Sequence, residues 1–271
     1  MKKIFQNAIT ILSLIILTNC SSDDEPSTPT NGNFPDSPVQ VEGFSRINVQ
    51  HDVVFYITQG TSTTIYAENP SISGEFSIEN STLNIRNNAT GTIVHVTTPV
   101  LEEVIGVDRI EVHLDTLRSL ENQDLTITLN HDAKITAHRI VTNDFNVIAS
   151  ERFEIGVDTL MAINADVATG HDAQVRLEGI QDASNADNVI ESLYLHKFQG
   201  NDRLAFNQGT LKTGPVISKV TNIVSGHDTK AYAYVTEELK GNTGDRSIIT
   251  YKGSGNATIT VGDGGSVHPV N

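Results

Sequence analysis

The sequence has no tryptophan, one cysteine, six tyrosines and nine phenylalanines among 271 residues. A single cysteine excludes a disulfide within the chain, and the shortage of aromatic residues makes platforms for sugar stacking scarce. Basic side chains are also few, because 18 Lys and Arg oppose 33 Asp and Glu. Nucleic acids and bare anionic lipid surfaces both require basic patches. We therefore expect no nucleic acid partner.

The chain also lacks an apolar run long enough to span a bilayer as a helix, which takes about 20 residues. Its longest run, Ile9–Leu17, follows two lysines and leads into Leu17-Thr18-Asn19-Cys20. That ending resembles the lipobox of bacterial lipoproteins, in which the cysteine becomes the acylated N-terminus. We expect residues 1–19 to be a lipoprotein signal peptide and Cys20 to be lipidated. An ordinary signal peptide with an incidental cysteine is the alternative.

Residues 20–38 have the composition of a flexible tether. They contain Ser21-Ser22-Asp23-Asp24-Glu25 and then four prolines among Ser, Thr, Asn and Gly, which predicts little burial of apolar surface. The acidic group resembles a signal that exports lipoproteins to the outer face of the outer membrane. We expect an outer-membrane protein that faces the cell exterior and touches the bilayer only through Cys20; an anchor facing the periplasm is the alternative.

Residues 39–271 show the alternation typical of β-strands and no long helical period. Leu125, Ile127 and Leu129, for example, alternate with Thr126 and Thr128, and such short runs are separated by Gly, Asn or Asp. Removing residues 1–19, with their two lysines, leaves 252 residues and changes the net charge from −15 to −17. This length suits one large β domain or two small ones, and we expect a single all-β domain over residues 39–271.

Recurring turn sequences distinguish between the all-β folds. His-Asp occurs four times, as His51-Asp52, His131-Asp132, His171-Asp172 and His227-Asp228, and looser Gly-x-Asp sequences begin at Gly106, Gly156 and Gly200. A β-sandwich explains the alternation, whereas a parallel β-helix also explains the repeated turns, since each coil reuses the same corner. The intervals suit coils of roughly 20–26 residues. We expect a solenoid with repeat coils in 106–271 and less regular N-terminal coils, or a cap, in 39–105.

Several segments together resemble the family called putative auto-transporter adhesin, head GIN domain. They are the strand pair Phe44–Val49 and Val53–Gly60 with its Gln-Gly turn, the short strand Leu83–Ile85, and the closing strand Ser247–Gly253 with its Tyr-x-Gly ending. The resemblance covers about Val41 to Val267. It implies a single-stranded right-handed parallel β-helix without established enzymatic activity. Where the family tends to have Ser or Ala at its corners this chain has His-Asp, so the family implies no chemistry there.

The His-Asp pairs are the main candidates for a site. His131, Asp132, His171, Asp172, His227 and Asp228 could bind a divalent cation such as calcium or zinc, because imidazole and carboxylate are common ligands. Asp also accepts hydrogen bonds from turn N–H groups, and His tolerates left-handed backbone. We favour structural corners, with no cofactor, over a metal site.

Two further sets of residues admit a functional interpretation. Asp108 with Arg109, and Asp202 with Arg203, could serve a polysaccharide-active lyase or hydrolase, although each is equally well explained as a turn Asp beside a solvated base. Tyr232, Tyr234 and Tyr251 could form an aromatic strip that binds a glycan or a protein, or could simply pack between coils. No residue is assigned as catalytic. We expect a non-catalytic surface adhesion or binding module; a structural envelope scaffold and the enzyme are the alternatives.

Overall fold

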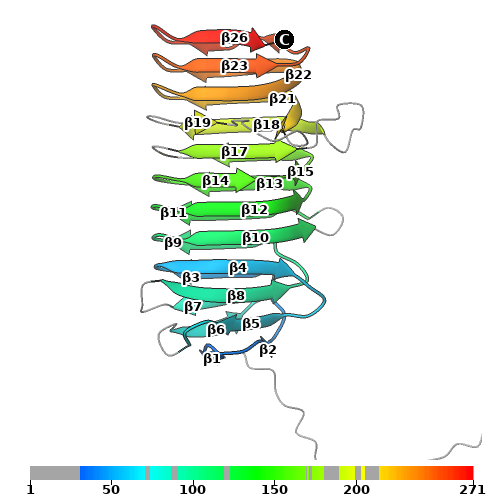
Figure 1. Cartoon of the computed structure of the whole chain (residues 1–271), viewed down its shortest axis with the longest axis vertical. Helices are drawn as coiled ribbons and strands as arrows, with labels where there is room; N and C mark the ends of the chain where they lie inside the picture. Colours follow the sequence, from blue (N-terminus) through cyan, green and yellow to red (C-terminus); the bar gives the residue numbers. More distant parts are fainter. Residues whose placement is uncertain are drawn as a thin grey trace, which may run out of the picture.

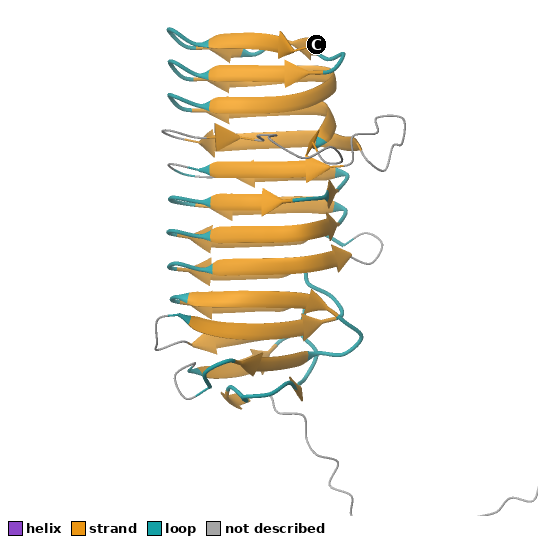
Figure 2. Cartoon of the chain, in the orientation of Figure 1, coloured by secondary structure: helices purple, strands orange, loops and turns teal. Residues whose placement is uncertain are grey.

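The computed structural model describes residues 31–70, 74–86, 91–118, 123–168, 170, 173–179, 189–198, 203–204 and 214–270. In these segments all regular secondary structure is β-strand (Figure 2). They contain no helix long and apolar enough to cross a membrane. The all-β expectation is confirmed.

The strands have the following bounds. The first group is β1 (Asn31–Asn33), β2 (Val39–Gln40), β3 (Arg46–Gln50), β4 (Val53–Gln59), β5 (Thr64–Ala67), β6 (Glu75–Glu79), β7 (Thr82–Arg86), β8 (Thr92–Thr98) and β9 (Glu103–Val107). The second is β10 (Glu111–Arg118), β11 (Leu125–Asn130), β12 (Lys134–Val141), β13 (Asp144–Ala149), β14 (Glu154–Val157), β15 (Leu160–Met161), β16 (Asn164–Ala168) and β17 (Gln174–Gly179). The third is β18 (Val189–Phe198), β19 (Arg203–Leu204), β20 (Gly214–Pro215), β21 (Ile217–Ser225), β22 (Lys230–Thr243), β23 (Ile248–Lys252), β24 (Asn256–Ala257), β25 (Thr260–Val261) and β26 (Ser266–Val270).

The strands stack in layers along the long axis of the molecule (Figure 1). A typical layer has one strand, a short corner and a second strand, so most strands belong to two parallel ladders. In addition, β15 pairs in parallel with the end of β12, and β20 pairs antiparallel with β17. The first ladder runs β7, β3, β9, β11, β13, β16, β18, β21, the end of β22, and then β24 and β25. The second runs β8, β4, β10, β12, β14, β17, β19, the start of β22, β23 and β26.

The layers near the N-terminus do not follow chain order. Strand β3 pairs with both β7 and β9, and β4 pairs with both β8 and β10. The β3–β4 layer therefore lies between two layers that come later in the chain. Antiparallel strands β1, β2, β5 and β6 close this end of the stack. Residues 39–105 thus contain both antiparallel closing strands and parallel layers.

Strand β1 begins at Asn31, within the segment 20–38 that the sequence predicts to be a tether. Strand β1 pairs with β6, and Phe34 is buried with its ring centroid 5.4 Å from that of Phe76. The described end of the tether is thus part of the cap.

The core is a column of inward side chains between the ladders. Because successive residues of a strand point to opposite faces, in-register pairing places each inward side chain on the one below. Leu125, Phe145, Ala165 and Leu193 form one such row, each at most 2% exposed. Large residues thus alternate with a small one. The outward positions between them carry the polar side chains.

Candidate functional site

The His-Asp pairs lie at the corners between the two ladders. His51 and His131 have φ of 68° and 57°, and at the third described pair Asp228 has φ of 59°. These are left-handed values, which His and Asp tolerate better than β-branched residues. His171 and Asp172 lie outside the described residues. The three described pairs are therefore corner residues, each followed by a strand of the second ladder.

Each described His-Asp corner pairs with an acid-Arg corner in the next layer. The Asp accepts two hydrogen bonds from the Arg guanidinium, and the His Nδ1 faces the neighbouring acid. The guanidinium pairs are Asp52 with Arg109, Asp132 with Arg152, and Asp228 with Arg246. The imidazole pairs are His51 with Asp108 at 3.2 Å, His131 with Glu151 at 3.4 Å, and His227 with Asp245 at 3.5 Å.

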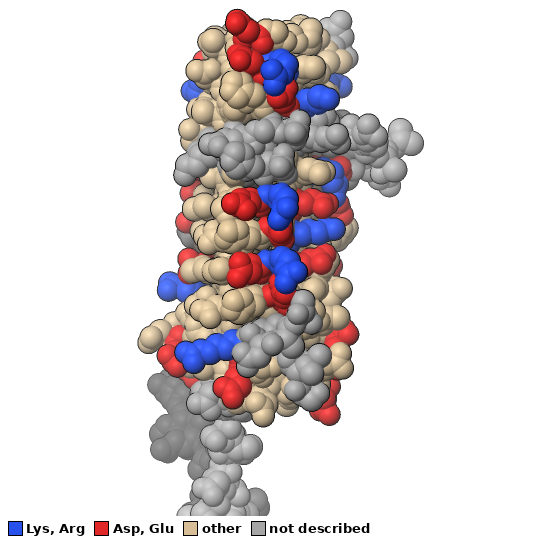
Figure 3. Space-filling view, turned by 90° about the vertical axis from the view of Figure 1, so that its left-hand side faces the viewer, with Lys and Arg blue, Asp and Glu red and all other residues tan. Residues whose placement is uncertain are grey.

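These corner pairs form a charged stripe down one side of the molecule (Figure 3). The hydrogen bonds from Arg246 lower the pKa of Asp228, since they favour its ionised form. The carboxylates of Asp132 and Asp228 thus already bind a guanidinium, whereas a metal ion would need the same oxygens as ligands. In the described residues, no three His, Cys, Asp or Glu side chains gather closely enough to hold a metal ion. Cation binding at these corners stays a prediction.

The corner pairing also changes the interpretation of Asp108 and Arg109. Arg109 binds Asp52 of the preceding corner, while Asp108 faces His51. Both side chains are thus engaged with the His51-Asp52 corner and are not free to bind a substrate together. Asp202 lies outside the described residues, as does the side chain of Arg203.

The three tyrosines expected to form one strip lie on two faces. Tyr232 and Tyr234 point outward from β22, and the Lys252 ammonium lies 5.8 Å from the centre of the Tyr234 ring. Burial raises the pKa of the Tyr232 hydroxyl, and Tyr234 adds to the effect. Tyr251 is paired with the inward Ala233 and packs against the core. Only Tyr232 and Tyr234 are placed to meet a partner, and their binding role stays a prediction.

A different aromatic feature crosses the outer face of the second ladder. The rings of Tyr66, His95, Tyr56 and His113 stack in that spatial order, from β5, β8, β4 and β10. Their centroids are 4.4, 5.1 and 4.7 Å apart, close to the spacing of neighbouring strands. We call these four rings the ring column. Because each ring covers the next, the column presents mainly ring edges with hydroxyl and nitrogen atoms.

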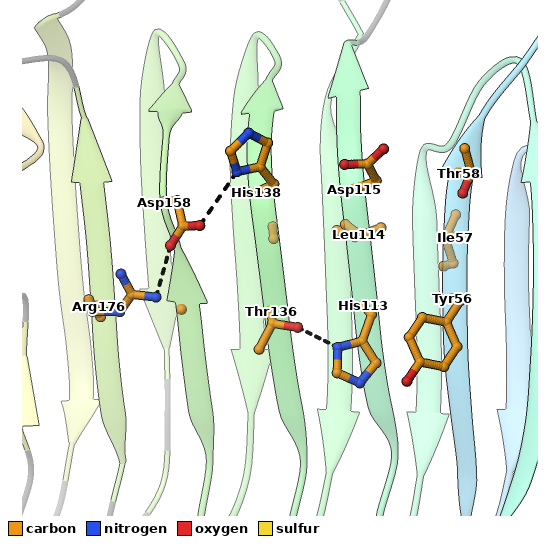
Figure 4. A pocket seen from close by; sticks show the side chains of 12 residues that line it. Tyr56, Ile57, Thr58, His113, Leu114, Asp115, Thr136, His138, Asp158 and Arg176 are labelled. Atoms are coloured by element: carbon orange, nitrogen blue, oxygen red, sulfur yellow. Dashed lines mark hydrogen bonds and ion pairs between the residues drawn. The ribbon is translucent and has the colours of Figure 1, made fainter. Parts of the chain in front are cut away.

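The ring column ends in a shallow groove of about 410 Å³ (Figure 4). Beyond His113 the same outward row continues with Thr136, Gly156 and Arg176 in strands β12, β14 and β17. A threonine and a glycine are too small to continue the column, so the face is hollowed there. A Cβ atom at Gly156 would lie 2.9 Å from Nη2 of Arg176, which shows that the guanidinium occupies the space the glycine leaves.

Arg176 is neutralised by two carboxylates. Its guanidinium donates to Asp158 Oδ1 at 3.0 Å and pairs with Glu178 Oε1 at 2.9 Å. Burial by itself lowers the pKa of Arg176, but the hydrogen bonds to Glu178 and Asp158 outweigh it, so the pKa is raised. His138 completes the arrangement with Nδ1 3.5 Å from Asp158 Oδ2. The guanidinium is a fixed, permanently charged wall of the groove.

His113 is held in one orientation at the opposite wall. Its Nε2 lies 3.1 Å from Glu111 Oε1, and its Nδ1 lies 2.6 Å from Thr136 Oγ1. A carboxylate can only accept, so Nε2–H donates to Glu111 and, in the neutral imidazole, Nδ1 accepts from the Thr136 hydroxyl. Asp115, next to this wall, is exposed and has no partner within the described part of the chain. The groove therefore combines fixed groups with one unpaired carboxylate.

A second hollow on the first ladder is acidic, and its side chains are already paired. Glu102 accepts a hydrogen bond from Ser45 at 2.8 Å and lies 3.8 Å from Arg46. Asp124 accepts from Asn143 and from the backbone of Asp144. These contacts tie neighbouring layers together, so we take the groove beside the ring column as the candidate site.

Solved structures from two Parabacteroides species share this fold. A protein named "putative adhesin" from Parabacteroides merdae ATCC 43184 is 15% identical to this chain, with a TM-score of 0.67. The match covers 89% of this chain and 97% of that protein. Two proteins from Parabacteroides distasonis ATCC 8503 are also similar. One, named "putative adhesin", is 12% identical with a TM-score of 0.63 and coverages of 90% of this chain and 98% of its own. The other, named "putative lipid binding protein", is 10% identical with a TM-score of 0.60 and coverages of 91% and 98%. No family model and no curated relative matches the sequence. At these identities the likeness shows the fold alone.

Proposed function

We propose that this chain is a non-catalytic binding module of the bacterial cell envelope, displayed on a lipid anchor and binding through the groove beside the ring column. The observation that carries the proposal is the groove itself. Parallel pairing of β4, β10, β12, β14 and β17 fixes its groups on a rigid, open face. A structural scaffold would need no such hollow.

The proposal includes a finer statement of the fold and family. We infer a single-stranded right-handed parallel β-helix of the head GIN domain family. It is supported by register intervals of 17 to 29 residues between successive layers from β9 onward, such as Ile217 to Tyr234, Glu111 to Lys134 and Gln174 to Arg203, and by neighbours that carry the name adhesin. The lipobox-like sequence ending at Cys20 supports the anchor, and the acidic residues that follow support display at the outer membrane.

A polysaccharide-active enzyme is the second candidate, because the groove contains two carboxylates, Asp115 and Asp158. They lie two strand spacings apart, about 10 Å, which is the upper end of the range for an inverting glycosidase pair. The Asp158 carboxylate, however, is bound by Arg176 at one oxygen and faces His138 with the other, so neither oxygen is free for a substrate. Binding without turnover is the better-supported function.

The anchor and the binding role have separate tests. Cells fed a palmitate analogue should label the wild-type chain but not Cys20→Ser, and external protease should remove the labelled protein from intact cells. Retention of the chain after protease would contradict outward display.

For binding, the mature chain (residues 20–271, Cys20→Ser) is fluorescently labelled and applied to cells and isolated envelope material. Thr136→Phe, which fills the groove with one more ring, should lose this binding.

A further inference from the structure

We propose that the groove binds an uncharged glycan, and that Asp115, His138 and Thr136 are the side chains that select it. The inference rests on the proposed binding function and adds the chemical class of the ligand. It follows from which hydrogen-bonding groups face the groove and from which charges there are already neutralised.

Charged ligands fit this groove poorly. Arg176, the cation in its lining, already binds Asp158 and Glu178, and the free carboxylate of Asp115 faces any incoming anion. A cation would be attracted to Asp115 but would gain little from the rings, since the two faces of Tyr56 are covered by His95 and His113. The other carboxylate in the lining, Asp158, is already bound by Arg176 and adds little to that attraction. A neutral ligand does not depend on these charges.

Sugar hydroxyls match the groups that are available. A hydroxyl donates to one partner and accepts from another, and here a carboxylate acceptor, Asp115, lies next to the imidazole of His138 on the neighbouring strand. The side chain of His138 is 70% exposed, and the residue Tyr56 is 42% exposed. Figure 4 shows these groups around the small residue Thr136, and Gly156 also lines the groove. A shallow, polar, open site of this kind suits one or two sugar units of a longer chain.

The inference also explains why the ring column stops at His113. An aromatic residue at 136 would continue the column and fill the hollow, whereas threonine leaves the space and its hydroxyl fixes His113 through a 2.6 Å hydrogen bond. The His113 imidazole is thereby fixed in the absence of a ligand, and this preorganisation lowers the entropic cost of binding.

The test uses the mature chain, residues 20–271 with Cys20→Ser, on an array of neutral, uronic-acid, sialylated and amino glycans, followed by titration calorimetry with the best neutral oligosaccharide. We expect neutral glycans to dominate. Asp115→Asn should weaken binding about tenfold or more, as the loss of a hydrogen bond to a charged group implies. Thr136→Phe should abolish it with thermal stability retained. The matched control Asp263→Asn, an exposed corner carboxylate outside the groove, should bind as the wild type does.

The outcomes separate this inference from the proposed function. Binding only to acidic or amino glycans, or neutral-glycan binding unaffected by Asp115→Asn and Thr136→Phe, overturns the ligand class or its site. Cell binding through the groove without any glycan signal also overturns the ligand class while leaving the binding function standing. Absence of binding to cells, envelope and array alike overturns both. Release of shortened products from a bound neutral glycan supports the ligand class and overturns the non-catalytic function.

Discussion

Glycines at one corner set how closely the last layers can stack. Gly226, Gly244 and Gly262 follow one another at intervals of 18 residues. A Cβ atom added at Gly244 would lie 2.7 Å from the carbonyl carbon of Gly226 and 2.8 Å from its oxygen, whereas ordinary contacts begin at 3.4 Å. The same pair is joined by a 2.9 Å backbone hydrogen bond from Gly244 N to Gly226 O. An alanine must therefore push backbone against backbone and stretch that bond.

We expect Gly244→Ala to lower the free energy of unfolding by about 1–3 kcal/mol, the usual cost of forcing a backbone shift in a packed structure. Gly43→Ala is the matched control, because its Cβ would meet only Thr63 Oγ1 at 3.9 Å and neither glycine has a positive φ. For a chain of this size the two variants should differ in Tm by about 2–12 °C. The assay is thermal unfolding followed by circular dichroism. Equal Tm values would refute the close stacking.

Three further predictions concern charge, core and metal. Because Arg246 lowers the pKa of Asp228, that carboxylate stabilises the fold above its ordinary pKa, and the contribution is lost as the pH falls through the lowered value. Asp228→Asn should therefore lower Tm at neutral pH but not in strong acid. The control Asp263→Asn should not lower Tm at either pH. Phe145→Ala should lower the free energy of unfolding in denaturant by about 3–5 kcal/mol, because its neighbour in the next layer, Ala165, is too small to fill the space. Calcium or zinc should leave Tm unchanged; a rise that disappears in Asp132→Ala would instead establish a metal site.

Much of the fold follows from the sequence by local rules. Alternation gave the inward and outward rows, since residues such as Leu125 and Ile127 are buried while Thr126 and Thr128 are not. The repeated turns located the corners, because a left-handed backbone restricts which residues can stand there. The facing of each residue and the position of each corner depend on a few neighbouring residues, so they can be predicted without knowing which strands pair.

The candidate site depends on pairing, which the sequence does not show. His51-Asp52 meets Asp108-Arg109 although 57 residues separate Asp52 from Arg109, because later strands lie on both sides of the β3–β4 layer. The same threading places Tyr56 between His95 and His113. The acid-Arg corners Glu151-Arg152 and Asp245-Arg246 were a usable signal, since each follows a His-Asp pair by 18 or 20 residues. Tyr251 lies on the other face because the register of β22 and β23 pairs it with Ala233, which lies between Tyr232 and Tyr234.

The insertion of the β3–β4 layer between later strands has a consequence for how the chain comes apart. From β9 onward most layers bond to the one made just before and the one made just after, so force on the C-terminal end can peel them off singly. The first strands cannot leave in this way, because β3 and β4 are held on one side by β7 and β8 and on the other by β9 and β10. The end nearest the expected lipid anchor is thus interlocked, and it resists a pull that the far end yields to in steps.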